Sequence, residues 1–101
     1  MRRIILSPDA KADIRSTIRW YRRTDPNLAL RFKLDARAIL RRIARFPYQF
    51  PLAEGTLRRA RLKQFPYAIY FSLKNSDVRV KSVVHERRAD SVWKSRGNGY
   101  S

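Results

Sequence analysis

The spacing of apolar residues changes near the middle of the chain, from a helical period to an alternation of every second residue. In the first half, two segments carry apolar residues three or four positions apart, which is the pattern of amphipathic helices. The first segment runs to about Arg23, and its stripe consists of Ala10, Ile14, Ile18 and Tyr21. The stripe of the second segment consists of Ala29, Phe32, Ala36, Ile39 and Ile43. Only a short turn joins the segments, so we expect an antiparallel helical hairpin.

Both predicted helices begin with recognisable start signals. Ser7 precedes Pro8 and Asp25 precedes Pro26, so each helix combines an N-cap side chain with proline at its first position. The short apolar run over residues 3–7 indicates a strand before the first helix.

Leu30 and Leu34 lie off the apolar stripe of the second helix. They fit lateral packing within the domain, or a strip on which a partner helix docks. The pattern leaves both interpretations open.

The second half predicts three antiparallel strands. Two prolines in "RFPYQFP" end the second helix, Gly55 marks a turn, and from Thr56 apolar and polar residues alternate. Turns are expected at "FP" (65–66) and "KNSD" (74–77), with a short C-terminal helical turn near Trp93. The fold class is therefore α+β, in the order β-α-α-β-β-β, with the helical hairpin packed on a small antiparallel sheet.

The turns also suggest a strand register. If "KNSD" brings Leu73 opposite Val78, then Phe71 faces Val80 and Ile69 faces Ser82. A tight turn at residues 65–66 would place Leu62 beside Ile69 and Ala60 beside Phe71. The apolar face of the sheet then packs against the two helices, and the other face of the sheet is exposed to solvent.

The same register collects charge on the solvent face. The residues expected there are Arg59, Arg61, Lys63, Tyr70, Arg79, Lys81 and His85, with Arg87 at the rim. Arginine and lysine bind phosphate, and a tyrosine can stack on a base. RNA cleavage needs a base, an acid and cations, so His85, Arg87 and Arg61 are candidate catalytic residues.

Simpler interpretations of this face remain open. Lysine and arginine on a solvated sheet often only prevent aggregation. A single histidine at a strand end is commonly a hydrogen-bonding residue, and Tyr70 fits cross-strand packing. We expect Trp93 to cap the fold.

Composition narrows the classes of protein further. A chain of 101 residues is one domain, which we place at residues 1–96, followed by a flexible tail at 97–101. The net charge of +16 favours a polyanion or an acidic protein as partner. One histidine and no cysteine leave too few ligands for a metal site, so we expect no metal and no other cofactor. No apolar run is long enough to span a membrane, and a cytoplasmic location is expected.

Three segments, in this order, carry a family resemblance: "LSPDAKADIRSTIRWY", "FPYAIYFSL" and "VVHERRADSVWKSR". Over residues 3–96 the chain resembles the RelE/ParE superfamily of bacterial toxins. The resemblance implies the toxin of a type II toxin–antitoxin module, of the plasmid-stabilisation kind, which inhibits growth. It also implies a small acidic antitoxin that would balance the charge and for which Leu30 and Leu34 are candidate contacts.

The superfamily contains two mechanisms. RelE-like members cut mRNA on the ribosome, whereas ParE-like members poison DNA gyrase without being nucleases. The RelE-type basic residues match Arg59, Arg61 and Arg87, but the arginine of the middle strand falls on Ala68 and the C-terminal tyrosine falls on Trp93. Related nucleases with a histidine near the last strand keep His85 a candidate.

The motifs favour the ParE-like mechanism, while enzyme activity stays open. The expected target contacts are Arg59, Lys63, Tyr70, Arg79, Lys81 and Arg88. The alternatives are a ribosome-dependent endoribonuclease and a non-toxic nucleic-acid-binding module.

Overall fold

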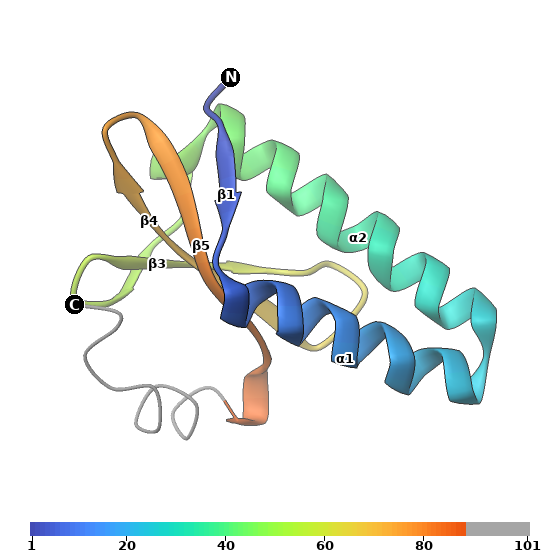
Figure 1. Cartoon of the computed structure of the whole chain (residues 1–101). Helices are drawn as coiled ribbons and strands as arrows, with labels where there is room; N and C mark the ends of the chain where they lie inside the picture. Colours follow the sequence, from blue (N-terminus) through green and yellow to red (C-terminus); the bar gives the residue numbers. More distant parts are fainter. Residues whose placement is uncertain (89–101) are drawn as a thin grey trace.

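The structure of the chain is a computed structural model, and it describes residues 1–88. A short strand and two helices precede a sheet meander and a final 3₁₀ turn (Figure 1). The elements are β1 (Ile4–Leu6), α1 (Pro8–Thr24), α2 (Pro26–Arg45), η1 (Pro47–Gln49), β2 (Leu52–Glu54), β3 (Leu57–Arg61), β4 (Tyr67–Lys74), β5 (Asp77–His85) and η2 (Glu86–Arg88). The predicted α+β class and element order are confirmed, with one added strand, β2.

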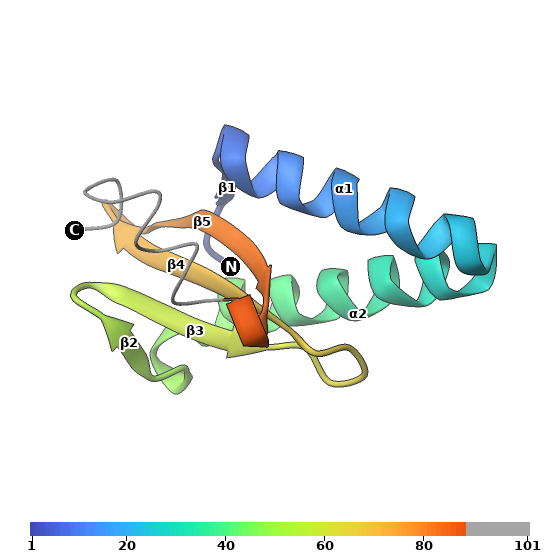
Figure 2. The same ribbon diagram turned by 90° about the horizontal axis from the view of Figure 1, so that it is seen from below.

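The sheet has five strands in the order β1-β5-β4-β3-β2. It is mixed and not wholly antiparallel as expected, because β1 pairs in parallel with β5 through Ile4–Val78 and Leu6–Val80. The N-terminal strand thus lies at one edge, beside the last strand. From there α1 begins next to β5, and α2 returns alongside it (Figures 1 and 2).

Both helix starts form as the sequence predicts. The Ser7 hydroxyl accepts a hydrogen bond from the Ala10 N–H at 3.0 Å, and the Asp25 carboxylate accepts one from the Asn27 N–H at 2.9 Å. Each cap satisfies an N–H that has no partner inside the helix. The hairpin is therefore defined locally before it packs.

The core lies between the helical hairpin and one face of the sheet. The whole predicted stripe of α2 is buried there, against Ile69, Phe71 and Val80 of the sheet. Near the hairpin turn, four rings pack edge-on or tilted, with centroids 5.1–6.3 Å apart: Tyr21, Phe32, Phe65 and Tyr67. This ring cluster closes the core at the end where β4 begins.

Leu30 and Leu34 are each 55% exposed. Lateral packing, the first interpretation of these residues, is therefore wrong within residues 1–88. They lie i, i+4 apart on the exposed side of α2, and docking of a partner helix there stays a prediction.

Asp35 fastens α2 to the loop between β3 and β4. Its buried carboxylate accepts hydrogen bonds from the N–H groups of Lys63 and Gln64, at 3.1 and 2.7 Å. These two bonds give the buried carboxylate of Asp35 its hydrogen-bond partners.

The predicted register holds at the β4–β5 turn and fails further on. Leu73 faces Val78 and Phe71 faces Val80, as expected, but a β-bulge then pairs Ser82 with Tyr70 instead of Ile69. On the other side of β4, Ala60 pairs with Ile69 and not with Phe71, a slip of two residues. A slip of two keeps every side chain on its predicted face, whereas the one-residue bulge turns the rest of β5 over.

A 3₁₀ turn at Glu86–Arg88 follows β5 directly, ahead of the place where the sequence predicted a helical turn. The position near Trp93, the domain limit at residue 96 and the tail at 97–101 lie outside the described residues.

The β4–β5 turn contains a residue in an unfavourable backbone conformation. Asn75 and Ser76 have φ values of 51° and 71°, so this two-residue turn needs the left-handed region at both positions. Ser76→Gly should raise the free energy of unfolding by about 0.5–1 kcal/mol, because glycine adopts positive φ without steric cost. Urea denaturation followed by circular dichroism measures this change.

The same substitution at Ser72, inside β4, is the matched control. There glycine adds only backbone freedom, so Ser72→Gly should lower the stability. Equal effects at the two positions would contradict a strained turn.

Candidate functional site

The basic face of the sheet forms largely as predicted. Arg59 pairs with Tyr70 and Arg61 with Ala68, and Ala68 and Tyr70 belong to a small apolar cluster separate from the helix-covered core. Arg79 lies opposite Ser72 on β5, and Lys81 is the extra residue at the bulge. Lys63 is exposed just beyond β3. The cations therefore gather around the open face of β3, β4 and β5.

Tyr70 does not offer the stacking surface that the sequence suggested. It is only 1% exposed and packs with Ala68, Val84 and Ala53. The structure therefore corrects its assignment as a target contact: its ring fills the open side of the sheet, in agreement with the cross-strand alternative.

Two polar atoms on either side of the bulge are buried without a hydrogen-bond partner. They are the Nε of Arg79 and the hydroxyl of Ser82. Unsatisfied groups of this kind usually mark strain or a missing partner. Here they flank the position where the ladder between β4 and β5 is interrupted.

His85 lies on the opposite face from the one predicted. It pairs with Tyr67, whose ring belongs to the helix-side core, and the two rings meet edge to face at 5.2 Å. The Nδ1 atom of His85 accepts a hydrogen bond from the Arg87 N–H at 3.2 Å. The reason for the error is the bulge, which reverses the parity of β5 after Lys81.

The three candidate catalytic residues consequently do not converge on one face. Arg61 stands on the open face, where its Nε lies 3.4 Å from the Glu86 carboxylate. His85 faces the helices, and Arg87 is exposed in the 3₁₀ turn that follows β5. This arrangement separates His85 from Arg61, the candidate cation on the open face.

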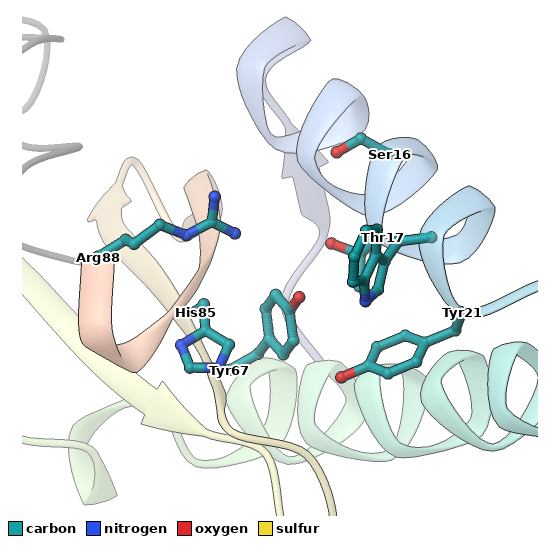
Figure 3. Close-up of a pocket in the computed structure, with 7 residues that line it drawn as sticks. Ser16, Thr17, Tyr21, Tyr67, His85 and Arg88 are labelled. Carbon is teal, nitrogen blue, oxygen red and sulfur yellow. The ribbon is translucent and has the colours of Figure 1, made fainter. Parts of the chain in front are cut away.

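A cavity lies beside His85, between α1 and the end of β5. Its volume is about 530 Å³, and its lining residues are Ser16, Thr17, Trp20, Tyr21, Tyr67, His85 and Arg88. Figure 3 shows Arg88 across the cavity from Ser16 and Thr17, with His85 and Tyr67 between them. A smaller hollow of about 220 Å³ shares several of these residues and reaches Asp13 and Val83.

Sequence reasoning missed this cavity, although one signal was available. Trp20 falls outside the apolar stripe of α1 and is 62% exposed. An exposed tryptophan next to core tyrosines is unusual on a helix whose other outward residues are charged or small. Arg88, an expected target contact, is also part of the cavity wall, and its contact with a target stays a prediction.

The electrostatics of the cavity floor affect Tyr21. Burial, followed by the neighbouring Tyr67 hydroxyl, raises the pKa of the Tyr21 phenol above its usual value. The neutral phenol is therefore the form that the folded protein favours.

A second basic region lies at the C-terminal end of α2. Arg2, Arg3 and Arg45 line a hollow of about 460 Å³ beside Asp77. The Arg3 guanidinium donates to the Asp77 carboxylate at 2.9 Å, which lowers the pKa of Asp77 and raises that of Arg3. This pair ties β1 to the start of β5.

Within residues 1–88, no group of three or more potential metal ligands gathers in one place. In the same residues, no helix is both long and apolar enough to cross a membrane.

The fold of the chain is similar to that of a solved protein structure. A solved chain described as the chromosomal ParDE TA system from P. aeruginosa has a TM-score of 0.74 and is 18% identical in sequence. The match covers 84% of this chain and 96% of that one. At this identity the match shows a shared fold. A search of curated proteins gives no match.

The sequence itself matches the family described as ParE toxin of type II toxin-antitoxin system, parDE, over residues 4–90. The chain belongs to this ParE toxin family. The resemblance noted from the sequence is thereby confirmed, and membership implies an antitoxin partner.

The raised pKa of Tyr21 gives stability a dependence on alkaline pH. A group whose pKa is higher in the folded state contributes stability that is complete below its unfolded value, about 10, and is lost as pH rises through the folded value. The free energy of unfolding should therefore fall above about pH 10. The fall should be smaller in Tyr21→Phe, whose ring cannot ionise. Urea titrations at pH 8 and pH 11 compare the two proteins, and identical pH dependence would contradict this assignment.

Proposed function

We propose that this toxin stops growth by binding DNA gyrase, without cutting RNA, and that an acidic antitoxin neutralises it. The observation that carries this proposal is the match to the ParE toxin family over residues 4–90. Gyrase poisoning is what the resemblance to ParE-like members implies. Both steps would take place in the cytoplasm, and the module would act in plasmid stabilisation.

The geometry around the last strand supports a binding poison over a nuclease. Arg61 and His85 occupy opposite faces of the sheet, and Ala68 stands where RelE-like nucleases have an arginine. Losing one group that stabilises transition-state charge typically costs about 2.7–4 kcal/mol of barrier. The open face then serves as a contact surface through Arg59, Lys63, Arg79 and Lys81, with Arg87 at its rim.

The charge of the toxin supports an acidic partner. A net charge of +16 attracts an acidic chain from a distance and orients its approach. For close contact, Leu30 and Leu34 provide an exposed apolar pair with i, i+4 spacing on α2. A partner helix can cover such a pair with its own apolar stripe.

The first experiment separates the two mechanisms in cells and in solution. The toxin is expressed in bacteria without an antitoxin, and mRNA 5′ ends are mapped as growth slows. Purified toxin is then added to gyrase, and supercoiling is followed on gels. We expect growth arrest with intact mRNA and loss of supercoiling, and we expect His85→Ala to retain most of its toxicity because no proton transfer is required.

Codon-phased mRNA cuts that disappear in His85→Ala or Arg87→Ala would overturn the proposal and establish the endoribonuclease. Harmless expression of soluble, folded protein would instead favour a nucleic-acid-binding module.

A second experiment tests the contact with the antitoxin. The double variant Leu30→Ala/Leu34→Ala should bind the antitoxin encoded beside the toxin about tenfold or more weakly, because two partly exposed leucines lose their burial in the complex. Calorimetric titration measures the affinity.

Leu52→Ala on β2 is the matched control, since Leu52 is similarly exposed, at 59%, and lies away from α2. Equal losses in both variants would place the antitoxin elsewhere or show a general effect of removing surface leucines.

A further inference from the structure

The cavity beside His85 combines flat ring surfaces with a single cation. Trp20, Tyr21, Tyr67 and His85 contribute four rings from three different elements. Its volume of about 530 Å³ falls within the range of small-molecule sites. Neither the sheet face nor the exposed leucines of α2 form part of it, so the cavity is independent of the surfaces proposed above.

The rings suit a planar aromatic group. Tyr67 and His85 already meet edge to face at 5.2 Å, and Tyr21 and Tyr67 do so at 6.3 Å. Trp20 adds a large indole surface that is mostly open to solvent. Every nucleobase has a π-face that stacks on such side chains, and each stacked base contributes about 1–3 kcal/mol.

Arg88 supplies an anion-binding group at the rim. It is exposed on η2, and among residues 1–88 the recorded ion pairs are Arg3–Asp77 and Arg61–Glu86, which leaves its guanidinium available. A guanidinium binds phosphate oxygens through two parallel N–H donors. Figure 3 shows its side chain reaching across the cavity toward α1, where the hydroxyl residues Ser16 and Thr17 lie.

Among residues 1–88, Asp13 is the acidic residue that shares a hollow with Arg88. The residues lining the larger cavity include no carboxylate. Asp13 lines the adjoining hollow, but its carboxylate accepts a hydrogen bond from the Val83 N–H at 2.8 Å and is held against β5. Arg88 lines both hollows, and the anion is expected on the side of Arg88 that faces the larger cavity.

We propose that this cavity binds a nucleoside monophosphate unit, with the base against the exposed indole of Trp20 and the phosphate on Arg88. The Thr17 hydroxyl, and the Ser16 hydroxyl as an acceptor since it already donates to the Asp13 carbonyl, favour a base, whose edge offers hydrogen-bonding groups, over the plain aromatic side chain of a peptide. The unit has two sources: a free mononucleotide, or one unstacked nucleotide of a single strand. The site goes beyond gyrase binding and does not depend on it.

Fluorescence of Trp20 reports directly on occupancy. The chain has two tryptophans, so Trp93→Phe leaves Trp20 as the single reporter. The purified full-length variant is titrated at low salt with AMP and UMP, with adenosine and uridine, and with inorganic phosphate. Amide chemical shifts of Thr17 and Arg88, measured by NMR, confirm where the ligand lies.

We expect saturable quenching by the mononucleotides. The nucleosides should bind at least about tenfold more weakly than the mononucleotides, because nucleosides lack the phosphate that forms charged hydrogen bonds to Arg88. Arg88→Ala should weaken mononucleotide binding to a similar degree. Arg22→Ala removes the same charge from the far side of α1 and should change the affinity less than twofold, since residues 20 and 22 point about 200° apart on a helix.

A short oligonucleotide distinguishes the two sources. Tighter binding than AMP, lost when the bases are replaced by abasic sites, identifies the single strand as the ligand. Equal or weaker binding identifies the free nucleotide.

Three results would overturn the proposal. The first is an absence of saturable quenching by mononucleotides and oligonucleotide. The second is equal loss of affinity in Arg22→Ala and Arg88→Ala, which would indicate general attraction to a cationic protein. The third is quenching by an acidic aromatic peptide but not by nucleotides, which would make the cavity a protein-docking site.

Discussion

The arrangement of the last strand depends on the hydrogen bonds that α1 makes to the bulge of β5. The Ser7 N–H donates to the Val80 carbonyl, and the Ser7 hydroxyl donates to the Lys81 carbonyl, both at 3.0 Å. Nearly two turns further along α1, Asp13 accepts from the Val83 N–H. β1 ends at Leu6, so these side chains take over the edge of β5 where no strand is available to pair with it. The same serine also caps α1, and helix and strand are therefore fixed together.

The chemistry of the end of β5 follows from this constraint. Without the bulge, His85 would share the open face with Arg61, as in an RNA-cleaving arrangement. With the bulge, the imidazole joins Tyr67 on the helix side and Val84 takes the outward position. One inserted residue thus separates a basic contact surface from an aromatic cavity. The two surfaces therefore share few side chains.

Much of the fold could be predicted because its signals are local. The caps at Ser7 and Asp25 and the two helical stripes depend on neighbouring residues alone, and so does the turn at residues 74–77. The face on which each strand residue lies could also be predicted, because apolar and polar residues alternate along a strand and successive side chains point to opposite faces. The two-residue offset between β3 and β4 could not, because a shift of two leaves every face unchanged.

The bulge and the cavity escaped prediction for a different reason. Val83 and Val84 are both apolar, so the sequence there suits either parity, and the choice is made by Ser7 and Asp13 from a distant part of the chain. The three-residue strand β2 is too short to show alternation. The burial of Tyr70 was missed because parity gives the face of a residue and not how deeply it is covered.

The pairing of β1 with β5 also has a consequence for how the protein is made. Ile4 and Val78 are neighbours in the sheet but lie far apart in the chain, and Arg3 bonds to Asp77 across the same separation. Until the ribosome has released residues 77–85, the edge strand has no partner and the bulge that anchors α1 does not exist. Contacts between such distant residues slow folding, because the loop between them must close first. A nascent chain therefore cannot complete the surfaces beside β5 until residues 77–85 have left the ribosome.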